Sequence, residues 1–188
     1  MAALRIIGGY LARMRSRHLL LAVLVFTVLV RLASLGQYPL IDTTEARYGE
    51  IARLMKETGD WITPRISQDV PFWGKPPLSF WFSAASMKLF GVNEFAARLP
   101  SWLLAIMVSA MVWQLAVRQI NRGYALTTTL VLNTAMVFWV GSGAVMTDPT
   151  LLVGVTVCMM AFWRAMKFKE TSGKLWGYVF FAGLLIGL

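Results

Sequence analysis

The sequence is poor in charge and nearly free of cysteine, and both shortages restrict what the chain can be. Only 14% of its 188 residues are charged, whereas soluble domains carry about 25%. Hydrophobic residues make up 57%, and the mean hydropathy is +0.62. These values argue against a water-soluble globule, a disordered tail or a nucleic-acid module. The single cysteine, Cys158, lies in an apolar stretch, so neither a disulfide framework nor a cysteine-based metal site is predicted.

The sequence also lacks the short motifs of several large enzyme classes. It contains no Walker loop, GxSxG, HExxH or GxGxxG pattern. The net charge is +9, but the cations lie between long apolar runs, which favours a membrane surface over nucleic acid as the partner. Because the chain stops inside an apolar run, we interpret it as the front part of a longer protein.

Membrane spans are predicted from the apolar runs, because a span needs about 17–25 mostly apolar residues. In chain order, the sequence predicts a cytoplasmic N-terminus at 1–18, a first span at 19–35, an outer loop at 36–99, a second span at 100–117, a third at 124–145, an outer turn at 146–150, a fourth span at 151–166, a cytoplasmic loop at 167–174 and the start of a truncated fifth span at 175–188. We expect Arg31, which is costly within a span, to reach outward or to find an acidic partner.

The orientation follows from the distribution of lysine and arginine. The N-terminus, the 118–122 turn and the 164–174 loop are rich in cations and hold a single acid, Glu170. Cytoplasmic loops carry this excess of positive charge. The N-terminus is therefore predicted to be cytoplasmic, and the 36–99 loop and the 146–150 turn are predicted to share the opposite side.

The outer loop contains two predicted helices that do not cross the membrane. Tyr48, Ile51, Ala52 and Met55 recur at helical spacing and form one apolar stripe, which Gly59 follows as a helix-ending glycine. We expect this amphipathic helix to lie against the membrane surface. The apolar segment 76–87 would rise only about 18 Å as a helix, too short for a hydrocarbon core of roughly 30 Å, so it is predicted to be interfacial or re-entrant.

Carboxylates and cations gather at the predicted outer boundary of the membrane. The candidates are Asp42, Glu45 and Asp148, with Arg47, Arg65 and Lys75. Cations there could hold a phosphate, and carboxylates could act on a hydroxyl or an amine.

Structural interpretations of the same residues stay open. Asp42 and Glu45 have the spacing of a capping box, and Asp148 followed by proline has the pattern of a helix N-cap. Lys75 and Arg65 could be interfacial anchors, as lysine and arginine often are near span ends.

Several segments in order resemble one family of membrane enzymes. These are residues 39–52 (PLIDTTEARYGEIA), 59–64 (GDWITP), 74–78 (GKPPL), 90–101 (FGVNEFAARLPS) and 146–149 (MTDP). Together they resemble the bacterial GT-C glycosyltransferases, in the group of the aminoarabinose–lipid A transferases and protein O-mannosyltransferases. The resemblance implies an all-α polytopic membrane protein, with GT-C-like transmembrane helices and amphipathic juxtamembrane helices in the first periplasmic loop.

The resemblance also implies an activity and a location. It implies a glycosyltransferase of the bacterial inner membrane whose active face is periplasmic. The enzyme would move a sugar from a polyprenyl-phosphate donor to lipid A, a glycan or a protein. Membrane lipids are its other expected partners, and nucleic acid is not an expected partner.

Carried over by motif, the resemblance assigns roles to the candidate residues. Asp42 and Glu45 with Asp148 would be the active-site carboxylates, Asp42 being favoured over Glu45. Lys75 would face the donor phosphate. Arg47 and Arg65, which the resemblance does not assign, are further phosphate-binding candidates because they lie in the same outer loop.

Two departures from the family pattern bear on these roles. Many relatives have adjacent Asp-Glu where this sequence has Thr44-Glu45. Some relatives place a glutamate before the Lys-Pro lysine, where this sequence has Gly74; no metal is therefore predicted there, and no cofactor is predicted. A divalent metal elsewhere is possible without being predicted.

Two other classes of function compete with the enzyme. A translocator of lipid-linked sugars, or a small-molecule transporter, predicts ionisable residues at midplane depth and broken helices inside the bilayer. The other alternative is an inactive truncated membrane module.

Overall fold

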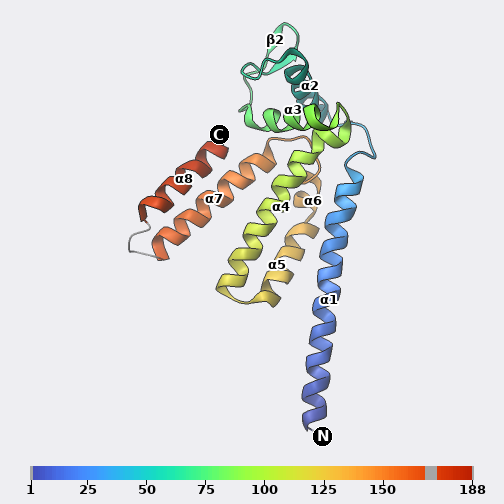
Figure 1. The fold of residues 1–188 in the computed structure, drawn as a ribbon, viewed down its shortest axis with the longest axis vertical. Helices are drawn as coiled ribbons and strands as arrows, with labels where there is room; N and C mark the ends of the chain where they lie inside the picture. Colours follow the sequence, from blue (N-terminus) through green and yellow to red (C-terminus); the bar gives the residue numbers. More distant parts are fainter. Residues whose placement is uncertain (1, 168–172, 188) are drawn as a thin grey trace.

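The computed structural model describes residues 2–167 and 173–187 as a set of long helices capped at one end by shorter elements (Figure 1). The elements are α1 (Ala2–Ser34), α2 (Thr43–Thr58), β1 (Arg65–Ser67), β2 (Val70–Pro71), α3 (Leu78–Phe90), α4 (Glu94–Gln119), α5 (Arg122–Thr134), α6 (Met136–Gly141), α7 (Asp148–Lys167) and α8 (Gly173–Gly187). We call α2, the β1–β2 hairpin and α3 the cap. The predicted all-α membrane fold class is confirmed, with a two-stranded antiparallel hairpin added.

The long helices pack against one another below the cap. Segments Arg17–Ser34, Glu94–Gln119 and Asp148–Lys167 are long and apolar enough to cross a membrane. Helix α4 contacts α5 and α7, α7 contacts α8, and α1 contacts α5. Large apolar side chains such as Phe26 and Phe181 are 68% and 64% exposed on the outer faces. Such faces suit helices solvated by lipid rather than by water.

The segment predicted as the third span, 124–145, is not one helix. It forms α5 and α6, separated at Ala135, whose φ of −63° and ψ of 126° are extended. At about 1.5 Å per residue, neither piece crosses a bilayer alone. In the last turn of α6, Arg31 Nη2 donates to the Val140 carbonyl at 2.8 Å.

Helix α4 begins six residues before the predicted second span. Asn93 is its N-cap and accepts from the Ala96 N–H at 2.8 Å, while Glu94 places negative charge in the first turn. The bounds of the predicted outer loop, 36–99, stay a prediction, and α4 begins within it. The first turns of α4 belong to the cap core, where Ala96 and Ala97 are buried.

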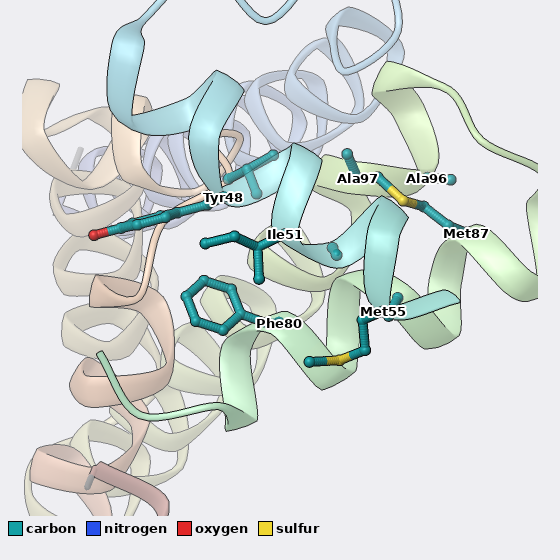
Figure 2. Close-up of a cluster of buried hydrophobic side chains, with 10 residues drawn as sticks. Tyr48, Ile51, Met55, Phe80, Met87, Ala96 and Ala97 are labelled. Atoms are coloured by element: carbon teal, nitrogen blue, oxygen red, sulfur yellow. The ribbon is translucent and has the colours of Figure 1, made fainter. Parts of the chain in front are cut away.

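The amphipathic helix is where the periodicity predicts it, but its apolar stripe faces protein. Gly59 ends α2 with a left-handed φ of 72°, which confirms the predicted helix-ending glycine. The stripe packs on α3 and on the start of α4, so its apolar side chains contact protein (Figure 2). That the helix lies against the membrane surface stays a prediction. Tyr48 and Phe80 meet edge to face with ring centroids 5.3 Å apart. Periodicity predicts an apolar face but does not specify what covers it.

Helix α3 covers the segment predicted to be interfacial. It lies across the ends of the long helices (Figure 1), and its 13 residues are too few to span a bilayer. One face is buried against α2 through Phe80 and Met87. The other exposes apolar residues, among them Leu89, as an interfacial helix does.

Candidate active site

Asp42 caps helix α2 and remains exposed. Its Oδ1 accepts from the N–H groups of Thr44 at 2.8 Å and Glu45 at 3.2 Å. The N-cap interpretation of Asp42 is therefore confirmed. The reciprocal half of a capping box does not form, because the Glu45 side chain is engaged elsewhere. Capping does not remove Asp42 from solvent, and its carboxylate stays accessible.

Glu45 is buried in an ion pair with Arg98. Its two oxygens accept from Arg98 Nε at 2.7 Å and Nη2 at 2.8 Å, and Oε1 also accepts from the Val145 N–H at 3.1 Å. Glu45 is 6% exposed. A carboxylate held on both oxygens inside the protein is poorly placed to take a proton from a substrate. The catalytic assignment of Glu45 stays a prediction, and the geometry favours a structural role.

Arg98 is the largest fully buried side chain in the part of the chain that the structure describes. Besides Glu45, it donates from Nη1 to the carbonyls of Leu35 at 2.8 Å and Tyr38 at 2.6 Å, and from Nη2 to that of Pro39 at 3.0 Å. All five N–H groups of a guanidinium are thereby used. Its plane also lies 3.8 Å from the centre of the Tyr38 ring. Sequence patterns do not single out Arg98; the available signal is an arginine inside a run of alanine, leucine and proline.

Asp148 lies in the first turn of α7 and is exposed. The Leu151 N–H donates to the Thr147 carbonyl at 3.2 Å, which makes Thr147 the N-cap residue. The prediction of Asp148 as the N-cap is therefore wrong by one residue. As the first helical residue, its carboxylate benefits from the helix dipole. It is also free to face a substrate.

Two cavities meet at this first turn of α7. The larger, about 510 Å³, is apolar and is lined by parts of α4, α6 and α7 together with Asp148. The smaller, about 140 Å³, is lined by Lys75 and Ser79 on one side and by Thr147 and Thr150 on the other. The structure therefore brings the exposed Lys75 beside the residues that flank Asp148, although 70 or more positions separate them in sequence.

The two remaining cations lie apart from these cavities. Arg47 is exposed on α2. Arg65 lies in β1, where its Nη2 pairs with Asp60 at 3.4 Å and its Nη1 donates to the Gln68 carbonyl at 3.1 Å. Its guanidinium is thus already engaged in the hairpin. The phosphate-binding roles of Arg47 and Arg65 stay predictions that no contact in the described residues supports.

Two acids at the surface of the cap have lowered pKa values because nearby groups hydrogen-bond to them. The Thr63 N–H, followed by the Ile62 N–H and by Arg65, holds the pKa of the Asp60 carboxyl below its usual range. On α2, the hydrogen bond from Arg53 lowers the pKa of Glu50. These acids are ionised partners of their neighbours and do not behave as proton acceptors near neutral pH. Within the described residues, no group of three or more His, Cys, Asp or Glu converges as a metal site would require.

Comparison with known proteins relates most of the chain to one family. Residues 15–188 match the family described as dolichyl-phosphate-mannose-protein mannosyltransferase. A curated relative from Serratia proteamaculans, an undecaprenyl phosphate-alpha-4-amino-4-deoxy-L-arabinose arabinosyl transferase, is 34% identical over 167 residues. That alignment covers 87% of this chain and 29% of the relative. The enzyme of the same name from Yersinia pestis is 32% identical and covers 82% and 28%.

Solved structures with the same arrangement come from Cupriavidus metallidurans. Its ArnT in the apo state has a TM-score of 0.79 at 25% identity, covering 94% of this chain and 32% of that one. ArnT bound to undecaprenyl phosphate has a TM-score of 0.75 at 26% identity, covering 89% and 31%. The chain thus spans under a third of the length of these relatives.

Proposed function

Because this chain belongs to the dolichyl-phosphate-mannose-protein mannosyltransferase family, we propose that the protein transfers a sugar from a polyprenyl-phosphate donor to an acceptor at the membrane surface. It is a multi-pass membrane protein, and its resemblance to GT-C glycosyltransferases is confirmed by the curated relatives and the ArnT structures. The observation that carries the proposal is the meeting of Lys75 with the start of α7, beside Asp148 and an apolar cavity.

The proposed chemistry is a direct displacement at the anomeric carbon. The bond from that carbon to the donor phosphate oxygen breaks, and its electron pair leaves on the phosphate. Lys75 stabilises the negative charge that develops there. The acceptor oxygen forms the new bond, and Asp148 or Asp42 takes its proton. The apolar cavity between α4, α6 and α7 would hold the polyprenyl chain close to the carboxylate.

The proposed location is the bacterial inner membrane, with the cap in the periplasm. Two observations support this orientation. The N-terminus of α1 and the α4–α5 turn lie at the end of the molecule opposite the cap (Figure 1). Both of these segments are basic, with Arg118 and Arg122 flanking the turn, and basic segments remain in the cytoplasm. Labelling of cysteines placed at Thr43 and Thr147 tests the orientation, because both should react with an impermeant reagent from the periplasmic side only.

The acceptor is proposed only as a class. The curated relatives are arabinosyl transferases by name, and the family description names protein mannosylation. We therefore propose lipid A, a glycan or a protein as the acceptor and a polyprenyl-phosphate-linked sugar as the donor.

The experiment is a transfer assay on protein expressed from its complete open reading frame. Asp148→Asn and Asp42→Asn are compared with Asp69→Asn, an exposed carboxylate in the hairpin turn of the same loop. Loss of a general base lowers the rate by about 10²–10⁴-fold. We expect that loss for Asp148→Asn or Asp42→Asn and wild-type turnover for Asp69→Asn. Wild-type rates in both of the first two variants, at equal expression, would refute the carboxylate assignment.

A further inference from the structure

Three polar side chains hydrogen-bond the stretch from Val140 in α6 to Val145 that leads into Asp148, and a fourth side chain holds one of the three. Arg31 Nη2 donates to the Val140 carbonyl at 2.8 Å, the Tyr38 hydroxyl donates to the Gly143 carbonyl at 3.4 Å, and Glu45 accepts from the Val145 N–H at 3.1 Å. Arg98 in turn holds Glu45. We call Arg31, Tyr38, Glu45 and Arg98 the polar clamp.

The members of the clamp also hold one another. Tyr38 stacks its ring on the Arg98 guanidinium, and its hydroxyl lies 3.4 Å from Arg31 Nη1. Arg98 fixes the backbone after α1 through the carbonyls of Leu35 and Pro39. One network therefore ties the end of α1, the start of α2, the start of α4 and the segment between α6 and α7. Arg31 finds hydroxyl and carbonyl partners here, and not the acidic partner or the outward path expected from the sequence.

Charge buried at this junction is not explained by stability alone. Well-packed apolar residues often stabilise a protein as much as a buried ion pair does. Hydrogen bonds differ from apolar contacts in being directional, so they fix both the distance and the orientation of the backbone that they hold. The clamp applies such bonds to the end of α6 and to the non-helical residues that follow it, Gly143 and Val145.

The clamp connects the two exposed carboxylates. Asp42 lies three residues before Glu45, and Asp148 lies three residues after Val145. Three residues of extended chain span at most about 11 Å, so the Glu45–Val145 hydrogen bond limits how far the two acids can separate. Resting on the proposed function, we infer that the polar clamp consists of positioning residues that hold Asp148 in register with Asp42 and Lys75 for sugar transfer.

Gly143 provides independent support for close packing at the clamp. A Cβ built at this position would collide with the Arg31 guanidinium, so a methyl group fits there only if Arg31 moves. Gly143→Ala should therefore push Arg31 away from the Val140 carbonyl while leaving every candidate catalytic side chain unchanged.

The test uses the mildest change to the clamp and a chemically identical control. Tyr38→Phe removes the hydroxyl that reaches Gly143 but keeps the ring that stacks on Arg98. Tyr48→Phe removes a hydroxyl from a ring in the cap core. Both variants, and Gly143→Ala, are made in protein expressed from the complete open reading frame.

Two readouts separate positioning from a general effect on folding. In the transfer assay with a polyprenyl-phosphate sugar, Tyr38→Phe should lower kcat roughly 3- to 10-fold, the value of one hydrogen bond, with KM for the donor nearly unchanged. In a Cys158→Ser background, Thr147→Cys should react several-fold faster with a maleimide in Tyr38→Phe and Gly143→Ala. A reporter at Lys56→Cys on α2 should not change, and Tyr48→Phe should match the parent protein in both assays.

Each outcome decides between defined alternatives. Unchanged kcat and unchanged Thr147→Cys reactivity in both clamp variants overturn the clamp. An equal effect from Tyr48→Phe also overturns it, because the effect would then belong to the whole cap. If the parent protein transfers no sugar but Thr147→Cys responds as expected, the clamp stands and the proposed function fails.

Discussion

Glu45→Gln provides a direct measure of the buried ion pair. The amide that replaces the carboxylate keeps one acceptor oxygen, but its NH₂ group faces an Arg98 donor, Nε or Nη2. Arg98 is 0% exposed, so its charge would lose its counter-charge without gaining water. Breaking a buried pair in this way costs about 3–5 kcal/mol. For a chain of this size, that corresponds to a fall in the unfolding midpoint of roughly 6–20 °C.

The assay is thermal unfolding in a fixed detergent, with a matched pair on the same helix as control. Glu50 is bonded to Arg53 at the exposed face of α2, and exposed pairs contribute only about 0–1 kcal/mol. Glu50→Gln should therefore shift the midpoint by no more than a few degrees. A Glu45→Gln midpoint equal to that of Glu50→Gln would refute the burial and pairing described for Glu45.

Three further predictions test separate features. Lys75→Gln should lower kcat about 10²-fold at unchanged stability, because a cation that stabilises the leaving phosphate is lost; a fall of less than threefold in the transfer assay contradicts that role. Gly59→Ala should destabilise the protein by about 1 kcal/mol, since φ is 72° there, whereas Gly141→Ala, with open space around its Cβ, should be neutral in the same unfolding measurement. Because the Thr63 N–H lowers the pKa of Asp60, the protection that this carboxylate gives the turn should be complete at neutral pH and be lost as the pH falls below the usual aspartate range. Hydrogen exchange of the Thr63 amide should follow that acid transition in wild type and show none in Asp60→Asn.

Local features of this protein are determined by neighbouring residues. Asp42 caps α2 because its own side chain reaches the N–H groups that follow it. Gly59 ends the same helix because it adopts a left-handed φ. The apolar runs around α1, α4 and α7 are long enough to identify candidate spans without reference to any partner. These features depend on residues that are close together in the sequence, so the sequence alone is enough to predict them.

Other features depend on which distant segments meet. Glu45 and Arg98 are 53 positions apart, so nothing near either residue indicates that they pair. The pairing leaves Asp42 and Asp148 as the exposed members of the three candidate carboxylates. Arg31 donates to the Val140 carbonyl in α6, which lies 109 positions away in sequence. The apolar stripe of α2 faces α3 and not lipid because α3 supplies a matching apolar face. The sequence determined the candidate spans, the two ends of α2 and the candidate charges. Tertiary packing decided which charges are buried as partners and which remain available for chemistry, because burial and pairing are properties of the assembled fold.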